Sequence, residues 1–231
     1  MKKYYVDSKE ILLGEVIGEG EEGKIHFVND FLVAKIFKDN RRVDIRKPDL
    51  DFYKYLTNFK LDKFHFPTDI IYDEYGTFSG CVMKYFKDGK AFPSCQDLDV
   101  SMVIKELRLL EEELKLISDS HIHIFDVKPN DILVNDTGIG VFDTGLYYRS
   151  EEKDLLKQNL ILINYALRAG LLWLYKDKSA QELKAYDLPE IYDILDDSIA
   201  YLSDILESEV EENKVKTITS LKEIYKTKKF C

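Results

Sequence analysis

The sequence has fewer basic than acidic residues, few histidines and few cysteines. Its 231 residues include 33 Lys and Arg against 43 Asp and Glu, which gives a formal net charge of −10 at pH 7. This balance argues against nucleic acid as the main partner, because phosphate binding requires a basic surface. It also disfavours attachment to an anionic membrane surface. The four histidines and three cysteines show no zinc-ligand spacing.

The cysteines indicate the redox state of the compartment in which we expect the protein to occur. Cys81, Cys95 and Cys231 form no CxxC motif and are odd in number. We therefore expect a reduced, cytoplasmic protein without a disulfide framework. The N-terminal stretch MKKYYVDSKEILL has two lysines but no apolar run typical of a signal peptide.

Long apolar runs are missing as well. The most apolar stretch, residues 160–175, is interrupted by Asn164 and Arg168. We interpret it as a buried helix and expect no membrane span. Residues 187–212 contain ten acids and no Lys or Arg. We interpret that run as solvated helix faces, with attraction of a basic partner as the alternative.

The residues that are present, 45% hydrophobic and 13% aromatic, suffice for a buried core. Residues 10–37 alternate and turn like strands, with a tight hairpin turn at Asn29-Asp30. Residues 68–86 predict two further strands joined by a turn at Gly76.

One helix is predicted within this β-rich part. Pro48 is a typical first residue of a helix. Two inner faces fit the period, and the sequence does not choose between them: Leu50, Tyr53 and Leu56, or Phe52, Tyr55 and Phe59.

After Phe86 the pattern becomes helical. A helix begins after Asp97 or Asp99, either of which is a plausible N-cap, and has apolar residues at positions 100, 103, 107, 110, 114 and 117. From Asp154 onwards the pattern is helical again. Two apolar faces are expected there: Leu155, Leu156, Leu160, Ile163 and Leu167, then Ile191, Ile194, Leu195, Ile199, Leu202 and Leu206.

These patterns predict an α+β fold with two lobes. The first lobe is small and β-rich and spans residues 1–86, and the second is helical and spans 87–231, with a linker near 84–96. We expect a ligand-binding cleft between the lobes.

Two motifs in the first lobe suit phosphate binding. Gly18, Gly20 and Gly23 form a GxGxxG pattern between two predicted strands. Because a strand follows, a glycine-rich hairpin over a nucleotide fits better than a dinucleotide-binding turn; a plain glycine turn is the alternative. Lys35 lies inside the apolar strand LVAKIF, where a phosphate would serve as its anionic partner. The alternative is a lysine that extends to water.

Two motifs in the second lobe suit phosphoryl transfer. Residues 126–131, here named the DxKP loop, read Asp-Val-Lys-Pro-Asn-Asp. A carboxylate at Asp126 can accept a hydroxyl proton, Lys128 can offset charge on a transferred phosphate, and Asp131 can bind Mg²⁺. Asp143, followed by Thr and Gly, suits a second metal ligand.

In this order the motifs resemble the protein kinase superfamily, over roughly residues 14–150. The resemblance implies Lys35 on the α- and β-phosphates, Asp126 as catalytic base and Lys128 on the γ-phosphate, with Mg²⁺ bound by Asp131 and Asp143. It also implies an ATP site with Met83 at the back of the adenine pocket and backbone groups offered by Lys84 and Phe86. The remaining implied contacts to ATP are Ile17, Gly18, Gly20, Gly23, Ile25, Val33 and Leu133.

Several positions depart from the family pattern. Ile124-Phe125 stand where kinases usually have His-Arg, so activation by phosphorylation through that Arg is not expected. Asp131 replaces the usual metal-binding Asn, and Thr144 replaces the usual Phe.

The partner of Lys35 is also missing from its usual place. Residues 38–73 contain no Glu that could pair with Lys35, and Asp44, Asp49 or Asp51 would have to substitute. Only ten residues separate Asp143 from Asp154, and no Ala-Pro-Glu motif follows. The acceptor is therefore a small molecule or a protein recognised in another way.

The leading hypothesis is a cytoplasmic phosphotransferase that uses ATP and Mg²⁺. It would resemble a Ser/Thr protein kinase and move the γ-phosphoryl group to a hydroxyl acceptor. The alternative is a pseudokinase, a nucleotide-binding or scaffold module without turnover, which the missing His-Arg pair and the missing Glu favour.

Overall fold

The computed structural model describes residues 2–38, 48–95 and 98–176, together with scattered positions between 207 and 220. The chain divides into two compact units. Unit 1 comprises Met1–Lys87 and Thr144–Leu146, and unit 2 comprises Asp88–Asp143 and Tyr147–Cys231.

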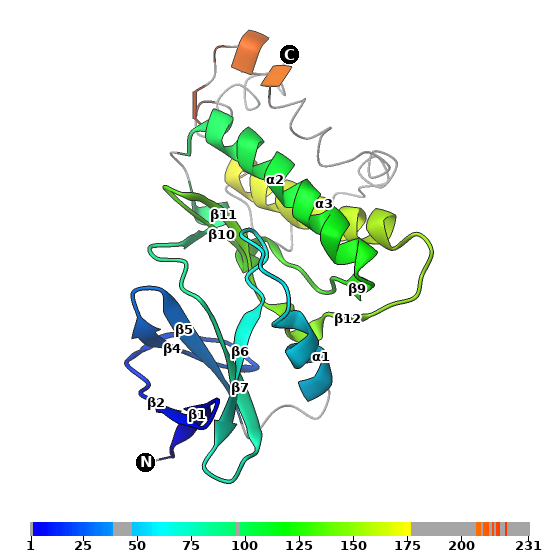
Figure 1. The fold of residues 1–231 in the computed structure, drawn as a ribbon. Helices are drawn as coiled ribbons and strands as arrows, with labels where there is room; N and C mark the ends of the chain where they lie inside the picture. Colours follow the sequence, from blue (N-terminus) through cyan, green and yellow to red (C-terminus); the bar gives the residue numbers. More distant parts are fainter. Residues whose placement is uncertain are drawn as a thin grey trace. The chain divides into compact units, whose positions relative to one another are not determined.

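Unit 1 is built on one twisted sheet of seven strands in the order β2-β1-β6-β7-β5-β4-β3 (Figure 1). All neighbouring strands in it run antiparallel. The strands are β1 (Tyr4–Val6), β2 (Lys9–Ile11), β3 (Val16–Glu19), β4 (Gly23–Asn29), β5 (Leu32–Phe37), β6 (Pro67–Asp73) and β7 (Phe78–Lys84). Strands β3 to β7 occur where the sequence predicted them.

The two predicted hairpin turns are both confirmed. Between β4 and β5, the Phe31 N–H donates to Asn29 Oδ1 at 2.9 Å, which is the local bond that makes Asn a good turn residue. Between β6 and β7, Gly76 has φ +77, a left-handed conformation that glycine adopts without strain.

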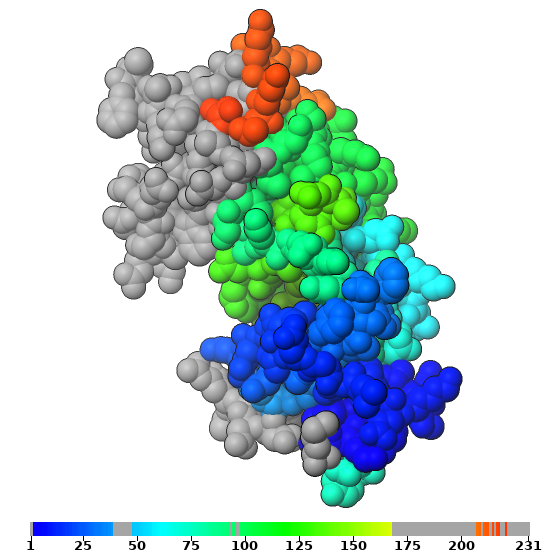
Figure 2. Space-filling view, turned by 90° about the vertical axis from the view of Figure 1, so that its left-hand side faces the viewer, coloured from blue at the N-terminus to red at the C-terminus, as the bar shows by residue number. Residues whose placement is uncertain are grey.

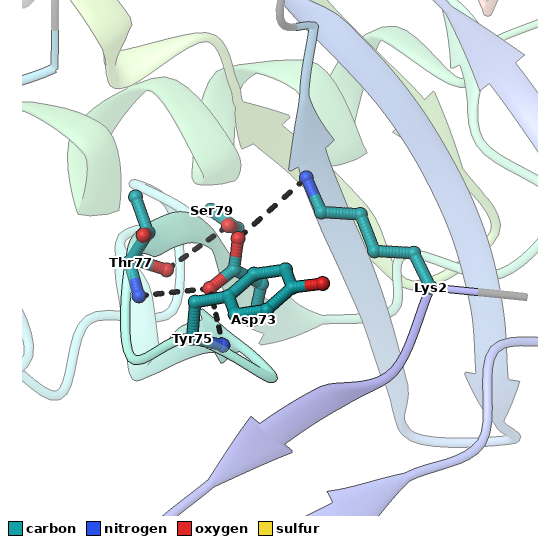
Figure 3. A network of polar contacts seen from close by, with 5 residues as sticks. All are labelled: Lys2, Asp73, Tyr75, Thr77 and Ser79. Atoms are coloured by element: carbon teal, nitrogen blue, oxygen red, sulfur yellow. Dashed lines mark hydrogen bonds and ion pairs between the residues drawn. The ribbon is translucent and has the colours of Figure 1, made fainter.

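A buried carboxylate holds the β6–β7 turn together (Figure 3). Asp73 Oδ1 accepts the N–H groups of Tyr75 at 3.0 Å and Thr77 at 2.9 Å, and Lys2 lies 3.6 Å from its other oxygen. Burial opposes the charged form, but the two N–H groups and Lys2 outweigh it and lower the pKa of Asp73. Asp73 is therefore a structural acid that closes this turn.

Strands β1 and β2 were not predicted as a pair. Strand β1 adds to the edge of β6, with Tyr4 opposite Asp73. The space-filling view shows these N-terminal residues, in dark blue, beside the turquoise β6–β7 turn (Figure 2). Three-residue strands have too few positions for a periodic signal, so their partner decides whether they form.

Core residues lie on both faces of the unit 1 sheet because successive side chains of a strand alternate. Val33, Cys81 and Met83 form one cluster with Tyr53. The other cluster consists of Ala34, Ile36, Ile71 and Val82. Lys35 is two residues from Val33 and opposite Cys81, so it belongs to the first of these faces.

Helix α1 (Leu50–Leu56) supplies Tyr53 to that cluster. Its N-cap is Asp49, whose Oδ1 accepts the N–H groups of Asp51 at 3.0 Å and Phe52 at 3.3 Å. The helix buries Phe52, Tyr53 and Leu56, so its inner face combines members of both predicted alternatives.

Unit 2 centres on helix α2 (Val100–Asp119), for which Asp99 is the N-cap. The six predicted apolar positions are all 0% exposed: Val100, Val103, Leu107, Leu110, Leu114 and Ile117. Helix α3 (Leu155–Lys176) packs against α2 (Figure 1). The second apolar face, predicted at 191–206, lies outside the described residues.

Two small antiparallel sheets complete unit 2. One has the order β11-β10-β8, and the other pairs β12 with β9. Their strands are β8 (Lys90–Ala91), β9 (Ile122–His123), β10 (Ile132–Asn135), β11 (Gly138–Val141) and β12 (Tyr148–Arg149). Short 3-10 turns occur at η1 (Phe92–Ser94) and η2 (Pro129–Asp131), and η3 (Thr144–Leu146) belongs to unit 1.

A buried glutamate links α2 to β11. Glu106 is 4% exposed, and its Oε2 accepts the Ile139 N–H at 3.0 Å. Gly138 has φ +146, and a Cβ built there would overlap the Glu106 carboxylate. Glycine is therefore favoured at 138 by both conformation and space.

The predicted α+β class is confirmed for the described residues, since an antiparallel sheet and separate long helices make up the chain. None of the helices in that part combines the length and hydropathy that a bilayer crossing requires.

Candidate functional site

The glycine-rich hairpin is formed by β3 and β4 of unit 1. Gly18 pairs with Ile25, and the Gly20 N–H donates to the Gly23 carbonyl at 3.0 Å. Packing requires glycine only at Gly23, where a Cβ would overlap the Ile36 carbonyl oxygen. A Cβ at Gly20 would meet nothing within 4 Å, and one at Gly18 would make ordinary contacts with Ile25. Close approach of a ligand backbone or phosphate is one reason for glycine at such open positions.

The apolar residues predicted to contact adenine fall into two groups. Ile25, Val33 and Met83 pack together in one core cluster of unit 1, and Val33 lies opposite Met83 in the β5–β7 register. Ile17 is 42% exposed on β3. Leu133 lies in unit 2, in the middle strand of the β11-β10-β8 sheet.

The end of β7 brings Lys84 and Phe86 into contacts of unit 1. Lys84 Nζ donates to the Leu61 carbonyl and to Asp62 Oδ1, both at 2.9 Å. The Phe86 ring meets the buried His65 ring edge-on, with centroids 5.2 Å apart. Both side chains therefore have structural roles, which leaves their predicted backbone contacts to ATP as a proposal.

Lys35 pairs with a residue that the sequence did not indicate. Its Nζ donates to Glu22 Oε2 at 2.6 Å, and the two side chains are only 12% and 16% exposed. Of the predicted partners, Asp49 caps helix α1, Asp51 is exposed, and Asp44 lies outside the described residues. The carboxylate opposite Lys35 thus comes from the glycine-rich hairpin.

The DxKP loop of unit 2 holds an ion pair of its own. Lys128 Nζ donates to Asp126 Oδ2 at 2.7 Å. This bond and the charges of Asp126, Asp131 and Asp143 raise the pKa of Lys128, although burial opposes the shift. The structure therefore brings the four charged residues predicted in unit 2 into one electrostatic cluster.

Asp131 is the most buried acid of this cluster. Its Oδ2 accepts the Lys128 N–H at 2.8 Å, and its own N–H donates to the Lys128 carbonyl at 2.9 Å, which closes the turn. Burial and the charges of Asp143 and Asp126 raise the pKa of Asp131 to about 6, although the Lys128 N–H opposes the shift. Its backbone carbonyl also accepts the Phe142 N–H at 2.8 Å, next to Asp143.

Asp126 and Asp143 share an uncommon backbone conformation, with φ +55 and φ +63. Few residues other than glycine adopt left-handed φ, although Asp and Asn tolerate it best. Strained conformations of this kind are concentrated at functional sites. Two of the predicted site acids thus adopt this conformation, as do Asp7, Ser8, Asp88, His121 and Lys214 elsewhere in the described residues.

The donor set fits Mg²⁺ in its chemistry. Asp131 and Asp143 provide carboxylate oxygens. Burial is the main cause of the raised pKa of Asp131 and the Asp143 charge adds to it, so a divalent cation would favour the charged form of both acids. In the part of the chain that the structure describes, no group of three or more His, Cys, Asp or Glu side chains is arranged to hold a metal ion. Mg²⁺ commonly uses one or two carboxylates and takes its other oxygens from phosphates and water.

Sequence reasoning missed Asn159, which is 0% exposed in α3. Its Oδ1 accepts the Ile124 N–H at 2.9 Å, and its Nδ2 donates to Ser118 Oγ at 3.0 Å and the Ile122 carbonyl at 2.9 Å. The signal was present, because a polar residue stands midway between Leu155 and Ile163 on a predicted apolar face.

An aromatic group lies beside the DxKP loop. The Tyr148 hydroxyl and His123 Nδ1 are hydrogen bonded at 2.6 Å, and the Phe125 ring lies 6.3 Å from that of Tyr148. Burial lowers the pKa of His123. Phe125 therefore contacts the segment after Asp143 through its ring.

No family model matches the chain, and no curated protein matches it. Among solved structures, it is similar to a chain of the CAK complex from Chaetomium thermophilum bound to ATP-gamma-S, with a TM-score of 0.49 and 17% sequence identity. The alignment covers 65% of this chain and 49% of that chain, so it spans about half of the other's length.

Proposed function

We propose that the protein is a phosphotransferase that uses ATP and Mg²⁺ and resembles a Ser/Thr protein kinase. It would move the γ-phosphoryl group to the hydroxyl of a protein or small-molecule acceptor. The observation that supports this most is the cluster of Asp126, Lys128, Asp131 and Asp143. Lys128 Nζ binds Asp126 at 2.7 Å, the Lys128 N–H binds Asp131 at 2.8 Å, and the Asp131 carbonyl accepts the N–H of Phe142, next to Asp143. In this proposal unit 1 is the N-lobe and unit 2 a truncated C-lobe.

The proposed chemistry assigns one task to each loop residue. Asp126 accepts the proton of the acceptor hydroxyl while the hydroxyl oxygen forms a bond to the γ-phosphorus. The bond between the γ-phosphorus and the bridging oxygen of the β-phosphate breaks, which releases ADP. Lys128 offsets negative charge on the phosphoryl group during this exchange. Its pKa is raised, so it is cationic at neutral pH.

Asp131 and Asp143 would hold Mg²⁺, which supplies charge neutralisation at the phosphates when it is bound. In unit 1, Lys35 would bind the α- and β-phosphates beneath the hairpin of Gly18, Gly20 and Gly23. The proposed adenine contacts are Ile17, Ile25, Val33, Met83 and Leu133, with backbone groups of Lys84 and Phe86.

The proposed setting is the cytoplasm, and nucleic acid is not the proposed acceptor. Cys81 and Cys95 are both free and buried thiols, and a cytoplasmic location would keep them reduced. The acidic composition supports an acceptor other than nucleic acid.

A second candidate is a nucleotide-binding module without turnover. One observation favours it, namely that Asp126 Oδ2 is already bound by Lys128 at 2.7 Å. An oxygen that already accepts a bond from Lys128 is less accessible to the hydroxyl of an acceptor.

Label transfer separates the two candidates. The full chain is incubated with γ-labelled ATP, Mg²⁺ and candidate hydroxyl acceptors, beside the Asp126→Asn and Asp143→Asn variants. We expect phosphate release or transfer by the wild type and a loss of about 100-fold or more in either variant. Asp136→Asn, in the exposed β10–β11 turn, is the matched control and should leave the rate unchanged.

Other outcomes are equally informative. Thermal stabilisation by ATP without any turnover would support the nucleotide-binding module. Neither stabilisation nor turnover would exclude both nucleotide functions. Turnover that persists in Asp126→Asn would reject the role assigned to Asp126.

A further inference from the structure

The Glu22–Lys35 ion pair joins the glycine-rich hairpin to the strand lysine. Lys35 lies at the centre of β5, opposite Cys81 on β7 and Ile25 on β4. Burial raises the pKa of Cys81 to about 12, while the Lys35 charge opposes and the Glu22 charge reinforces the shift. The ion pair thus lies over a buried, protonated thiol, where an isolated ammonium would be costly.

The position of Glu22 is defined by its surroundings. Its carbonyl accepts the Lys38 N–H at 2.9 Å, which ties the hairpin turn to the end of β5. The adjacent Gly23 packs directly on the Ile36 carbonyl. Gly145, in η3 of unit 1, lies so close to the Glu22 carboxylate that a Cβ there would overlap both oxygens.

We propose that Glu22 is the positioning residue for Lys35, and this inference rests on the proposed function. It holds the ammonium in one direction within unit 1, so that the lysine is ready to bind nucleotide phosphates. An ammonium group has three N–H donors, so a bond to Glu22 is compatible with donation to a phosphate oxygen. The glycine-rich hairpin then has two tasks, because it approaches the phosphates through its glycines and orients the lysine through its acid.

A competing role for Glu22 would predict the opposite change in nucleotide affinity. If Glu22 occupied the ammonium in place of a phosphate, its removal would free Lys35 and tighten nucleotide binding. The partly buried, short contact favours positioning, because an oriented charge-assisted bond restricts a flexible lysine to one geometry.

Calorimetric titration of the full chain with ATP and Mg²⁺, and separately with adenosine, tests the proposal. Glu22→Gln should weaken ATP binding by about tenfold or more, because a charge-assisted bond is lost. Adenosine, which has no phosphate, should bind within about twofold of wild type because no lysine contact is involved. Glu22→Asp keeps the charge and should recover part of the loss. Glu21→Gln is the matched control on the same turn and should change neither affinity.

The other possible titration results reject either the proposed function or the role of Glu22. Absence of ATP binding in the wild type rejects the proposed function and this inference together. ATP binding that is equal in wild type and Glu22→Gln rejects the inference alone, and tighter binding shows that Glu22 competes with phosphate. If Glu22→Gln weakens ATP and adenosine equally and also lowers the melting temperature, Glu22 acts on the fold and the positioning role is rejected.

Discussion

The side chain of Asn159 accepts the backbone N–H of Ile124 at 2.9 Å, two residues before Asp126. The same amide donates to the Ile122 carbonyl and to Ser118. Helix α3, the end of α2 and the entry to the DxKP loop are thus joined by one buried polar group. A fully satisfied amide at 0% exposure both stabilises and specifies this arrangement.

Replacement of Asn159 should therefore be costly. Asn159→Ala leaves the Ile124 N–H and the Ile122 carbonyl buried without this partner, which lowers the free energy of unfolding by about 3 kcal/mol. Urea denaturation measures the difference. Gln158→Ala, on the neighbouring and partly exposed position of α3, should cost less than about 0.5 kcal/mol. Equal costs in the two variants would contradict the assignment.

Gly138→Ala should destabilise unit 2 in two ways. The alanine would adopt φ +146, and its Cβ would overlap the Glu106 carboxylate. We expect a loss of about 3 kcal/mol in the free energy of unfolding. The control is Gly76→Ala, which has φ +77 but no neighbour within 4 Å of a Cβ, so it should cost only about 1 kcal/mol. A Gly138 variant no worse than this control would show that Glu106 moves aside freely.

His65 should make stability depend on pH. Burial lowers its pKa from 6.5 to about 4, although the Lys84 backbone and Asp62 oppose the shift. The folded state therefore holds His65 neutral while the unfolded chain binds a proton below pH 6.5. Stability is full above pH 6.5 and falls as the pH decreases towards 4, by up to about 3 kcal/mol.

The measurement compares urea denaturation of wild type and His65→Leu between pH 4 and pH 7. The unfolding free energy of His65→Leu relative to that of the wild type should increase as the pH falls, because only the wild type loses stability through this group. His121→Gln, with a 60% exposed side chain, is the matched control and should follow the wild type. A pH-independent difference would mean that His65 does not titrate in this range.

Substitution by Asn should separate the chemistry of Asp126 and Asp143 from their structural role. Asn tolerates left-handed φ as well as Asp, and the Lys128–Asp126 pair is exposed. We expect Asp126→Asn and Asp143→Asn to stay within about 0.5 kcal/mol of wild type in unfolding free energy. The corresponding Ala variants should lose about 1 kcal/mol because Ala adopts this conformation less readily. Equal losses in Asn and Ala variants would contradict this reasoning.

The elements with strong local signals were predictable from the sequence. Helix α2 followed from six apolar positions at helical spacing and an aspartate N-cap, and all six positions are fully buried. The β4–β5 and β6–β7 hairpins followed from Asn29 and Gly76, which make turns through their own chemistry.

Relationships between distant positions were not predictable in the same way. The sequence indicated that Lys35 needs an acid, yet the partner depends on the register that places Glu22 beside it. Strand β1 depends on the free edge of β6, which no local pattern reveals. Asn159 was partly predictable. Its place on an apolar face indicates that it is buried, but does not indicate which groups it binds.

The left-handed backbone at Asp126 and Asp143 bears on how the sequences of relatives should be compared. At such positions glycine or asparagine satisfies the main chain at least as well as aspartate does. Drift towards those residues would therefore cost the fold little. Under the proposed function, relatives that share the activity should keep aspartate at both positions, because the fold alone would accept glycine or asparagine there.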